Sequence, residues 1–529
     1  MEHFTPSEAP IHETQRLPVA PPAPQIIGRN QELGQTFAQV RAGTTVLLHG
    51  PRGVGKSALA ATIAAAFTAF PGGVVWWPVE FDSLERLLAR LGRAFGLRTL
   101  SDSPSPLAHV GEVSGLVQRH NKPLLVLDGR LDLDVAREFV RKVAEGTPAI
   151  LINDVGGPGP WTPVEVGPLA EADAQSLFMR AAGIAPDHVS TIARANIQTL
   201  CQRLGRLPLA LVLAGQHVRA SEQTPGDFLA VLSAEDTDSP APGLAEIFRQ
   251  LPDPLQGMLL VIGSTFAGQA TMPLLEQLNP APPETITRVM EMLMQRGLVQ
   301  HAPGQGEDGC YYLHDVVHAF VHDWLDEAGH LEALTSRAQN ALLTFAEENH
   351  AASREARTRL VGEMPNLIAL ARLAYADRDT ATVRQLVDAL ASAFADTGGY
   401  GYELHRLEQM LPPAPEPAAP PVPVVPAAPV AAADPAAPVL EDPQATLDEL
   451  TQMAFPGLED APHPEAGPPV AAGIVPEPAP AEDTTFDTAP LRPLTREKFG
   501  PPPERVDFVP AAEEVAQIVP APAPPEPAP

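Results

Sequence analysis

One eight-residue stretch constrains the fold of this chain more than any other feature. It matches the pattern GxxxxGK[ST] and lies between an apolar run, TTVLLHG, and an alanine-rich stretch with helical periodicity. Its residues are Gly50, Pro51, Arg52, Gly53, Val54, Gly55, Lys56 and Ser57, and Ala58 follows them. In a strand, glycine-rich loop and helix of this order, backbone N–H groups converge at the positive end of the helix dipole. The stretch therefore predicts a phosphate-binding loop, in which Lys56 reaches the β- and γ-phosphates of a nucleotide and the Ser57 hydroxyl binds Mg²⁺.

A second apolar run, PLLVLD, ends at Asp128. A buried parallel strand delivers its last residues to the carboxyl edge of the sheet, where nucleotides bind. Asp128 is therefore predicted to hold Mg²⁺ together with Ser57, and to act with Lys56 in any hydrolysis. The alternative is an ordinary aspartate at the end of a strand.

The residue after Asp128 bears on hydrolysis. Many ATPases of this kind carry a second acid there, which polarises the attacking water, but this chain has Gly129. Asp132 and Asp134 lie nearby, although acids at the start of a helix are more often solvated. The sequence therefore favours nucleotide binding and leaves enzymatic activity open.

The chain of 529 residues is longer than one hydrophobic core usually organises. Residues 1–24 are polar and proline-rich, as in a flexible leader. From residue 25 to 165 short apolar runs alternate with helical patterns, which predicts an α/β P-loop domain with a parallel sheet. Residues 166–240 have helical periodicity throughout and predict a helical domain.

The next segments also have distinct patterns. Residues 241–327 combine helices with two strand-like runs around a glycine-rich turn, which predicts a winged-helix domain. Residues 328–411 are rich in alanine and leucine and predict a short all-α region of about four helices. From residue 412 to 529 proline and alanine dominate, with about half of all prolines and about half of the net negative charge. This tail is predicted to be disordered, with short islands near residues 447 and 507 that either dock on a partner or are accidental.

Composition excludes several classes of protein. A formal net charge of −30 and a pI near 4.8 argue against a chain that wraps nucleic acid or lies on an anionic membrane. The two cysteines, Cys201 and Cys310, have no disulfide or zinc spacing, and no signal peptide or membrane span is evident. We expect a cytoplasmic protein.

Further motifs follow the phosphate loop in a recognisable order. Ile26–Ile27–Gly28–Arg29 precedes it, Gly205–Arg206–Leu207–Pro208–Leu209–Ala210 lies in the helical segment, and Leu313–His314–Asp315 follows the predicted wing. This order resembles the STAND class of signal-transduction ATPases, specifically the bacterial type of the NB-ARC (AP-ATPase) family, over about residues 25–400. The resemblance implies that Ile27, Gly28 and Arg29 pack against the adenine and that Pro208 lies near the base and sugar. It also implies that His314 contacts the β-phosphate of ADP.

Some of these residues also have ordinary structural explanations, and the chain departs from the family in places. A proline at a helix start costs no hydrogen bond, and a lone histidine is often a packed or capping residue. The fourth strand of the family often ends in an arginine-bearing sequence, but here it reads AILIND, ending in Asn153 and Asp154. Asn153 is a weak candidate for a polar contact with the γ-phosphate. Pro365–Asn366–Leu367 resembles the entry to a helical sensor array that is cut short.

The resemblance implies a nucleotide switch in which bound ADP holds the domains closed and ATP favours an open form that binds partners or forms a homo-oligomer. The tail is a candidate for contacts with protein partners. One alternative is an ATP/ADP-binding scaffold with little or no hydrolysis. Another is a winged-helix DNA-binding regulator, although the predicted recognition helix mixes Arg288 and Arg296 with Glu284 and Glu291. Nucleic acid and membranes are therefore not expected partners.

Overall fold

The structure is a computed structural model that describes residues 20–67, 72–232, 241–302 and 309–412. The predicted tail with its two islands, and all but the last residues of the predicted leader, lie outside the described residues. No helix within the described ranges is long and apolar enough to cross a membrane.

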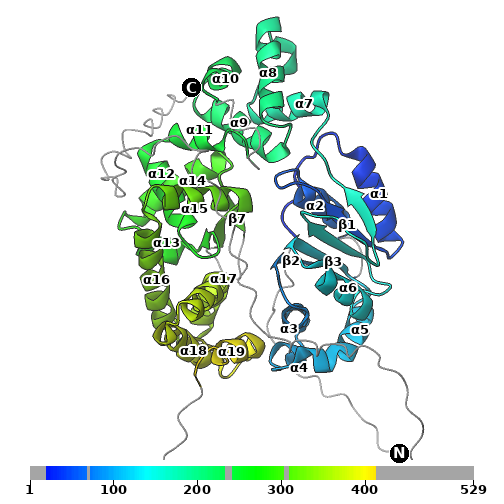
Figure 1. Cartoon of the computed structure of the whole chain (residues 1–529), viewed down its shortest axis with the longest axis vertical. Helices are drawn as coiled ribbons and strands as arrows, with labels where there is room; N and C mark the ends of the chain where they lie inside the picture. Colours follow the sequence, from blue (N-terminus) through cyan, green and yellow to red (C-terminus); the bar gives the residue numbers. More distant parts are fainter. Residues whose placement is uncertain (1–19, 68–71, 233–240, 303–308, 413–529) are drawn as a thin grey trace, which may run out of the picture. The chain divides into compact units, whose positions relative to one another are not determined.

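A five-stranded parallel sheet forms the first part of the fold (Figure 1). Its strands are β1 (Thr45–His49), β2 (Val74–Glu80), β3 (Leu124–Arg130), β4 (Ala149–Asn153) and β5 (Thr162–Glu165). They lie in the order β2-β3-β4-β1-β5, and each neighbouring pair is parallel. β4 thus lies between β1, which leads into the glycine-rich loop, and β3, which carries Asp128. The short edge strand β5, which contains Pro163, was not predicted from the sequence.

Helices cover both faces of this sheet. They are α1 (Asn30–Arg41), α2 (Lys56–Phe67), α3 (Leu84–Ala94), α4 (Arg98–Ser101), α5 (Val110–Arg119) and α6 (Leu133–Lys142), with a 3-10 turn at Pro106–His109. Val46 and Leu48 of β1 belong to one hydrophobic cluster with α1 and α2. Leu47 faces the other way and belongs to a cluster with α3, α5 and α6. Since successive side chains of a strand alternate between faces, burial on both sides explains why the strands read as continuous apolar runs.

An all-helical segment follows the sheet. Its helices are α7 (Glu171–Ala181), α8 (Thr191–Arg203), α9 (Pro208–Ala220) and α10 (Pro225–Val231). Local capping sets two of their starts: Ser190 Oγ accepts a hydrogen bond from the Ala193 N–H, and Thr224 forms a capping box with Asp227. Pro208 begins α9, where its missing N–H leaves no partner unsatisfied.

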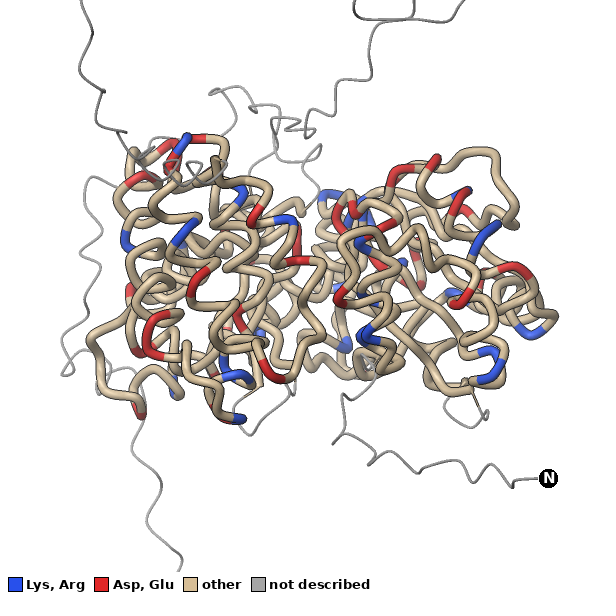
Figure 2. The backbone as a smooth tube through the Cα atoms, turned by 90° about the horizontal axis from the view of Figure 1, so that it is seen from below, with Lys and Arg blue, Asp and Glu red and all other residues tan. Residues whose placement is uncertain are grey.

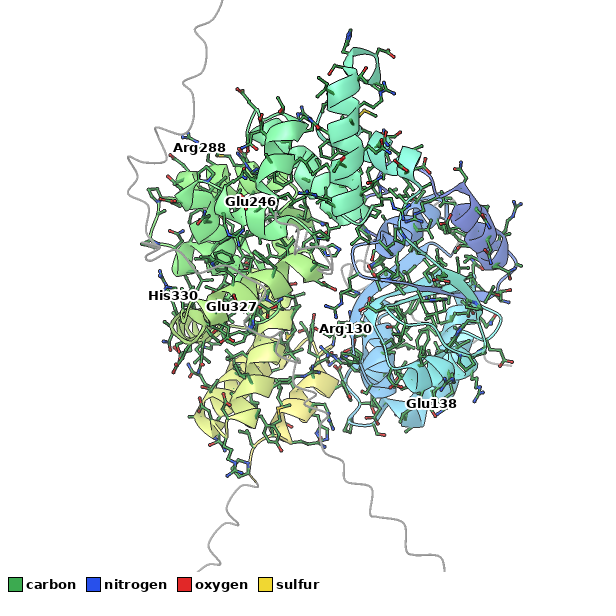
Figure 3. All side chains as sticks on the ribbon, turned by 45° about the horizontal axis from the view of Figure 1, so that its top comes forward. Arg130, Glu138, Glu246, Arg288, Glu327 and His330 are labelled. Carbon is green, nitrogen blue, oxygen red and sulfur yellow. The ribbon has the colours of Figure 1, made fainter. Side chains whose placement is uncertain are left out.

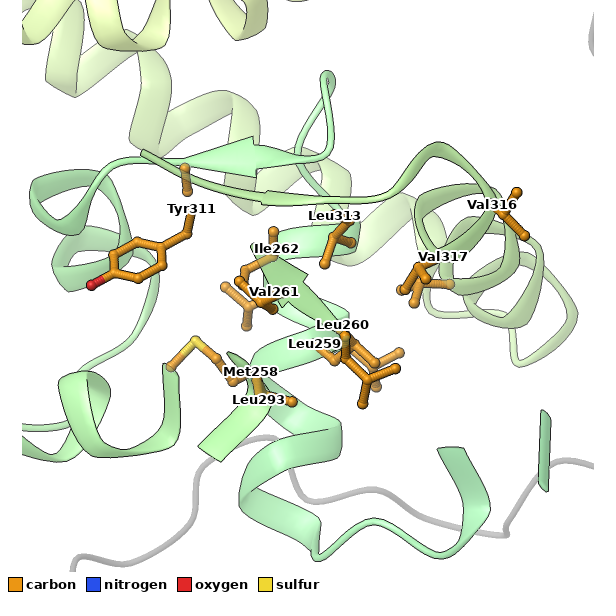
Figure 4. Packing of buried hydrophobic residues seen from close by; sticks show 14 of the residues in the cluster. Met258, Leu259, Leu260, Val261, Ile262, Leu293, Tyr311, Leu313, Val316 and Val317 are labelled. Atoms are coloured by element: carbon orange, nitrogen blue, oxygen red, sulfur yellow. The ribbon is translucent and has the colours of Figure 1, made fainter. Parts of the chain in front are cut away.

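The next segment has the element order of a winged helix. It comprises α11 (Leu244–Arg249), α12 (Asp253–Gly263), β6 (Gln269–Ala270), α13 (Met272–Leu278), α14 (Pro283–Gln295), β7 (Val299–Ala302), β8 (Cys310–Leu313) and α15 (Asp315–Glu327). The three strands form an antiparallel sheet in the order β6-β8-β7. Tyr311 and Leu313 extend from β8 toward α12, where Val261 and Ile262 are buried (Figure 4).

Four further helices complete the described chain: α16 (Leu331–Glu348), α17 (Arg354–Ala376), α18 (Thr380–Phe394) and α19 (Gly401–Glu408). Pro365 lies inside α17. One hydrophobic cluster includes residues from Leu169 to Met410, so the helical segment, the winged helix and these last helices share a continuous core. The predicted fold class is confirmed for the described residues: a P-loop-type α/β domain with a parallel sheet, then helices, a small antiparallel sheet and further helices.

Candidate functional site

The glycine-rich loop connects β1 to α2 and has a backbone that only glycine adopts easily. Gly50, Gly53 and Gly55 have φ of +147°, +74° and +92°. A Cβ on Gly50 would lie 2.2 Å from the carbonyl oxygen of Val166. The strand therefore passes too close to residue 166 for any side chain at position 50. The turn places Lys56 and Ser57 in the first turn of α2, at the positive end of its dipole.

Lys56 is buried and makes three contacts with acceptors. Its ammonium nitrogen donates to the carbonyl oxygens of Gly50 at 2.7 Å and Pro51 at 3.1 Å, and to Asp154 Oδ1 at 3.1 Å. The two carbonyls belong to the loop itself, so Lys56 also fixes the loop's conformation. The third contact comes from a residue whose role sequence analysis had not assigned.

Ser57 and Asp128 meet at the carboxyl edge of the sheet. Ser57 Oγ donates to Asp128 Oδ1 at 2.7 Å. Burial raises the pKa of Asp128 to about 6, and the negative charge of Asp315 adds to this, while the bond from Ser57 and the charge of Lys56 oppose it. A paired hydroxyl and carboxylate are the hard oxygen ligands that Mg²⁺ takes beside phosphate oxygens and waters. No group of three or more acidic, histidine or cysteine side chains among the described residues is placed to hold a metal.

Arg29 supports the loop from outside. Its guanidinium donates to the carbonyl oxygens of Val54 at 3.2 Å and Gly167 at 2.5 Å, and pairs with Glu32 at 2.9 Å. Only 7% of Arg29 is exposed, so the charge is held among these partners. The contacts with Val54 and Gly167 join the loop to the segment that leaves the sheet.

The residues before Arg29 lie close to the helical segment. Gly28 has φ of +69°, and a Cβ there would lie 2.3 Å from Asp173 in α7. Ile27 is partly buried against the helical cluster. The predicted contact of these residues with an adenine stays a prediction.

Pro208 lies beside the loop as well as at a helix start. The Leu209 N–H donates to the Gly53 carbonyl at 3.1 Å, and a Cβ on Gly55 would lie 3.8 Å from Pro208 Cγ. The start of α9 therefore contacts the loop directly. The helix-start explanation of the proline is observed, and its predicted contact with a base and sugar stays a prediction.

His314 caps α15 with one ring nitrogen. Its Nδ1 accepts a hydrogen bond from the Val316 N–H at 3.2 Å. Burial lowers the pKa of His314, the positive charges of Lys56 and Arg52 lower it further, and Asp315 opposes them. The imidazole is thus neutral at pH 7, and because Nδ1 accepts, the proton lies on Nε2, which can donate to an anion. The capping explanation is observed, and the ring also lies within electrostatic reach of both cations of the loop.

A glycine follows Asp128 in the chain, and the next two acids along the chain, Asp132 and Asp134, have partners of their own. Gly129 has φ of +138°, and a Cβ there would lie 2.1 Å from the Val79 carbonyl oxygen. Asp132 caps α6 by accepting from the Asp134 and Val135 N–H groups. Asp134 pairs with Arg137. Both acids therefore have local partners at a helix start.

The end of β4 supplies the residue that sequence analysis missed. Asn153, the weaker candidate, donates its side-chain amide to the Leu131 carbonyl at 2.9 Å and is buried. Asp154 instead contacts both Lys56 and Arg52, the latter at 3.0 Å. The sequence does show an acid, Asp154, at the end of a predicted strand. It does not show the order of the strands, which puts β4 beside β1 and brings Asp154 to Lys56.

Comparisons with known proteins give distant likenesses of fold. No protein-family model and no curated protein matches this chain. Among solved structures, a STAND protein with a tetratricopeptide-repeat sensor from Pyrococcus horikoshii is 19% identical, with a TM-score of 0.43, over 77% of this chain and 61% of that one. A Walker-type ATPase of Pyrococcus abyssi is 15% identical (TM-score 0.28, 57% of this chain and 97% of that one). Cdc6p from Pyrobaculum aerophilum is 12% identical (TM-score 0.30, 63% and 96%). This chain thus spans less than two thirds of the Pyrococcus horikoshii protein, and TM-scores below 0.5 transfer no property to it.

Proposed function

We propose that this chain binds ATP and ADP with Mg²⁺ at the glycine-rich loop and uses the exchange of one for the other as a conformational switch. The observation that carries the proposal is the arrangement at the start of α2. Lys56 lies in the loop and Ser57 Oγ lies 2.7 Å from Asp128, at the carboxyl edge of a parallel sheet. Converging loop amides, one ammonium group and a hydroxyl–carboxylate pair are what a nucleotide with Mg²⁺ requires.

Each residue has a role in this proposal. Lys56 binds the phosphates, and Ser57 and Asp128 hold Mg²⁺, which would neutralise phosphate charge. Pro208 lies beside the base and sugar, and Nε2 of His314 donates to a phosphate. Sheet, helical segment and winged helix would then all contact one ligand. A switch further requires that ADP and ATP favour different arrangements of the protein. A nucleotide that binds both arrangements with equal affinity does not change the populations of the two arrangements.

Regulated partner binding or self-association is the output that we propose for this switch. The closed arrangement would hold ADP, and ATP would favour a form that associates with partners or with further copies of the chain. This step rests on the family resemblance, and its direct measure is the mass of the protein in solution with each nucleotide.

A second candidate, a nucleotide-binding scaffold with little or no hydrolysis, is favoured by Gly129. Position 129 has no room even for a Cβ, and Asp132 and Asp134, the next acids along the chain, have local partners. We therefore expect phosphate release from the wild-type protein to be no faster than from Lys56→Ala. Turnover well above that variant would contradict the scaffold and favour an ATPase.

The DNA-binding alternative receives no support from α14. Arg296 is buried, which leaves Arg288 as the exposed arginine beside the exposed Glu284 and Glu291. Arg288 projects outward from the ribbon (Figure 3). Over the described residues, basic and acidic positions are interspersed along the backbone (Figure 2). A helix with this balance lacks the basic face that groove binding requires.

The proposal is tested by calorimetry with ADP and ATP in the presence of Mg²⁺, using the full chain. Loss of a charge-assisted hydrogen bond predicts that Lys56→Ala lowers affinity about tenfold to a hundredfold. Lys142→Ala is the matched control, because Lys142 is exposed and pairs with Glu138 on α6. Chromatography of nucleotide released by denaturing the purified protein identifies the resting ligand, which we expect to be ADP. A folded wild-type protein that gives no heat with either nucleotide would overturn the proposal.

A further inference from the structure

The carboxylate of Asp154 bridges the two cationic side chains of the glycine-rich loop. Its Oδ1 lies 3.1 Å from Lys56 Nζ, and its Oδ2 lies 3.0 Å from Arg52 Nε. Asp154 is 98 residues from Lys56 in the chain, so the contact is a product of the fold. It arises because β4, which ends at Asn153, pairs in parallel with β1, which ends at His49.

All three N–H donors of the Lys56 ammonium group have acceptors in the folded protein. An ammonium group has three N–H donors. Two point at the loop carbonyls of Gly50 and Pro51, and the third points at Asp154. Only the third can be transferred to a phosphate without breaking the loop's own bonds, and it is the one that Asp154 holds.

The bridge is ionic at neutral pH. Desolvation by itself would raise the pKa of Asp154, but the hydrogen bond from Arg52 and the charge of Lys56 outweigh it and hold the pKa below its usual value. The Asp154 side chain is 32% exposed, so it can turn away from the loop without a repacking of the core. Lys56 is 8% exposed and has no such freedom.

We propose that Asp154 is an internal competitor for the terminal phosphate of a nucleotide, which makes the loop favour a nucleoside diphosphate over a triphosphate. The inference rests on the proposed function, since it concerns the same site. A triphosphate brings one more phosphate to Lys56, which spans the β- and γ-phosphates, and that phosphate must take the third N–H from Asp154. It also places additional negative charge beside a carboxylate that has lost a partner. A diphosphate competes less with Asp154 for the third N–H and places less negative charge beside it. The loss of binding free energy caused by Asp154 therefore falls mainly on ATP.

The test is the ratio of ATP to ADP affinity, measured by calorimetry with Mg²⁺ on the full chain. Asp154→Asn keeps the shape of the side chain and removes its charge, so we expect ATP affinity to rise about tenfold relative to ADP affinity. Asp134→Asn is the matched control: it makes the same change of net charge on the exposed start of α6 and should leave the ratio within about twofold. Thermal unfolding without nucleotide verifies that both variants fold.

One result would overturn the inference while leaving the proposed function intact: a ratio in Asp154→Asn that equals that of the wild type. An equal ratio with unchanged affinities would mean that Asp154 does not compete with a phosphate. An equal ratio with a parallel loss of both affinities would mean that Asp154 only supports the loop. If the wild type binds neither nucleotide, the proposed function itself fails and the ratio is undefined.

Discussion

At the scale of single residues, backbone geometry restricts two positions around the site to glycine. Gly50, after β1, and Gly129, within β3, both have φ values that are strained for any residue with a Cβ. In each case a carbonyl oxygen of a neighbouring segment occupies the position that the Cβ would take. Glycine is therefore the residue that fits at both positions, and at position 129 the close carbonyl excludes the side chain of a second acid.

Gly129→Ala tests this constraint on stability. We expect a loss of about 1–3 kcal/mol in the free energy of unfolding, because the residue must adopt a strained backbone and move the Val79 carbonyl. Denaturant unfolding of the full chain measures it. Gly115→Ala, at an exposed position within α5 with nothing near its Cβ, should instead stabilise by about 0.5–1 kcal/mol. Equal effects of the two substitutions would show that Gly129 is not constrained.

His318 in α15 predicts a pH dependence. Its Nε2 lies 3.2 Å from the Thr265 carbonyl, which makes Nε2 the donor. Burial lowers its pKa, the bond to Thr265 opposes this, His322 lowers the pKa further, and Asp315 and Glu80 raise it. The imidazole of His318 titrates near pH 6.5 in the unfolded chain and at a lower pH in the folded protein. Between these two pH values the unfolded state therefore binds more protons than the folded state. The contribution of His318 to stability is thus complete above about pH 6.5 and is lost as the pH falls toward the folded pKa.

His318→Gln retains a donor for Thr265 but cannot titrate. The unfolding midpoint of this variant should fall less than that of the wild type between pH 7.5 and about pH 5.5. His188→Gln, at an exposed position, should follow the wild type. A pH profile of His318→Gln that superimposes on the wild type would refute the assignment.

At the scale of elements, α17 covers the open edge of the winged-helix sheet. β6 pairs with β8 on one side only. On its other side Asn366 accepts from the Ala267 N–H at 2.8 Å and donates to the Gln269 carbonyl at 2.8 Å. Glu363 accepts from the Thr271 N–H at 2.6 Å and from Asn366 at 2.7 Å. A short edge strand is thereby satisfied by side chains and not by another strand.

Asn366→Ala tests this arrangement, which sequence analysis interpreted only as the entry to a repeat array. The change leaves the Ala267 N–H without its partner, whereas the Gln269 carbonyl keeps Thr265 Oγ1 and Glu363 keeps the Thr271 N–H. We therefore expect a loss of about 1–3 kcal/mol in the free energy of unfolding. Faster hydrogen exchange of β6 amides would locate the effect. Asn340→Ala, on the exposed face of α16, is the control and should change stability by less than about 0.5 kcal/mol. An Asn366 variant as stable as this control would contradict the role.

At the scale of the described chain, α19 contacts the sheet domain through charged groups. Arg93 of α3 pairs with Glu403, donates to the Gly399 carbonyl at 2.6 Å and lies 3.6 Å over the ring of Tyr400. Asp102, after α4, accepts from the Gly399 N–H at 2.5 Å and from the Gly401 N–H at 3.0 Å. The last described helix is thus held to the domain that carries the phosphate loop.

Arg93→Ala should weaken this contact. It leaves the largely buried Glu403 carboxylate without its cation, and we expect a cost of about 1.5–3 kcal/mol and faster hydrogen exchange in α19. Glu403→Ala alone should cost a similar amount, and the double variant less than the sum, because the two side chains form one interaction. Arg384→Ala, at an exposed position of α18, should have no such effect. Strict additivity of Arg93→Ala and Glu403→Ala would show that the pair is not coupled.

Sequence alone determined the local parts of this protein: the strand, loop and helix around Lys56, the apolar strand of Asp128 and the α/β-then-helical order. These follow from short-range periodicity and from residue types with restricted conformations. Tertiary structure decided which distant groups meet, because strand order and helix packing are long-range outcomes that no local pattern records. Asp154 rather than Asn153 reaches Lys56, since β4 lies beside β1. Likewise, the pairing of Glu403 with Arg93 and the proximity of His314 to the loop's cations exist only in the folded chain.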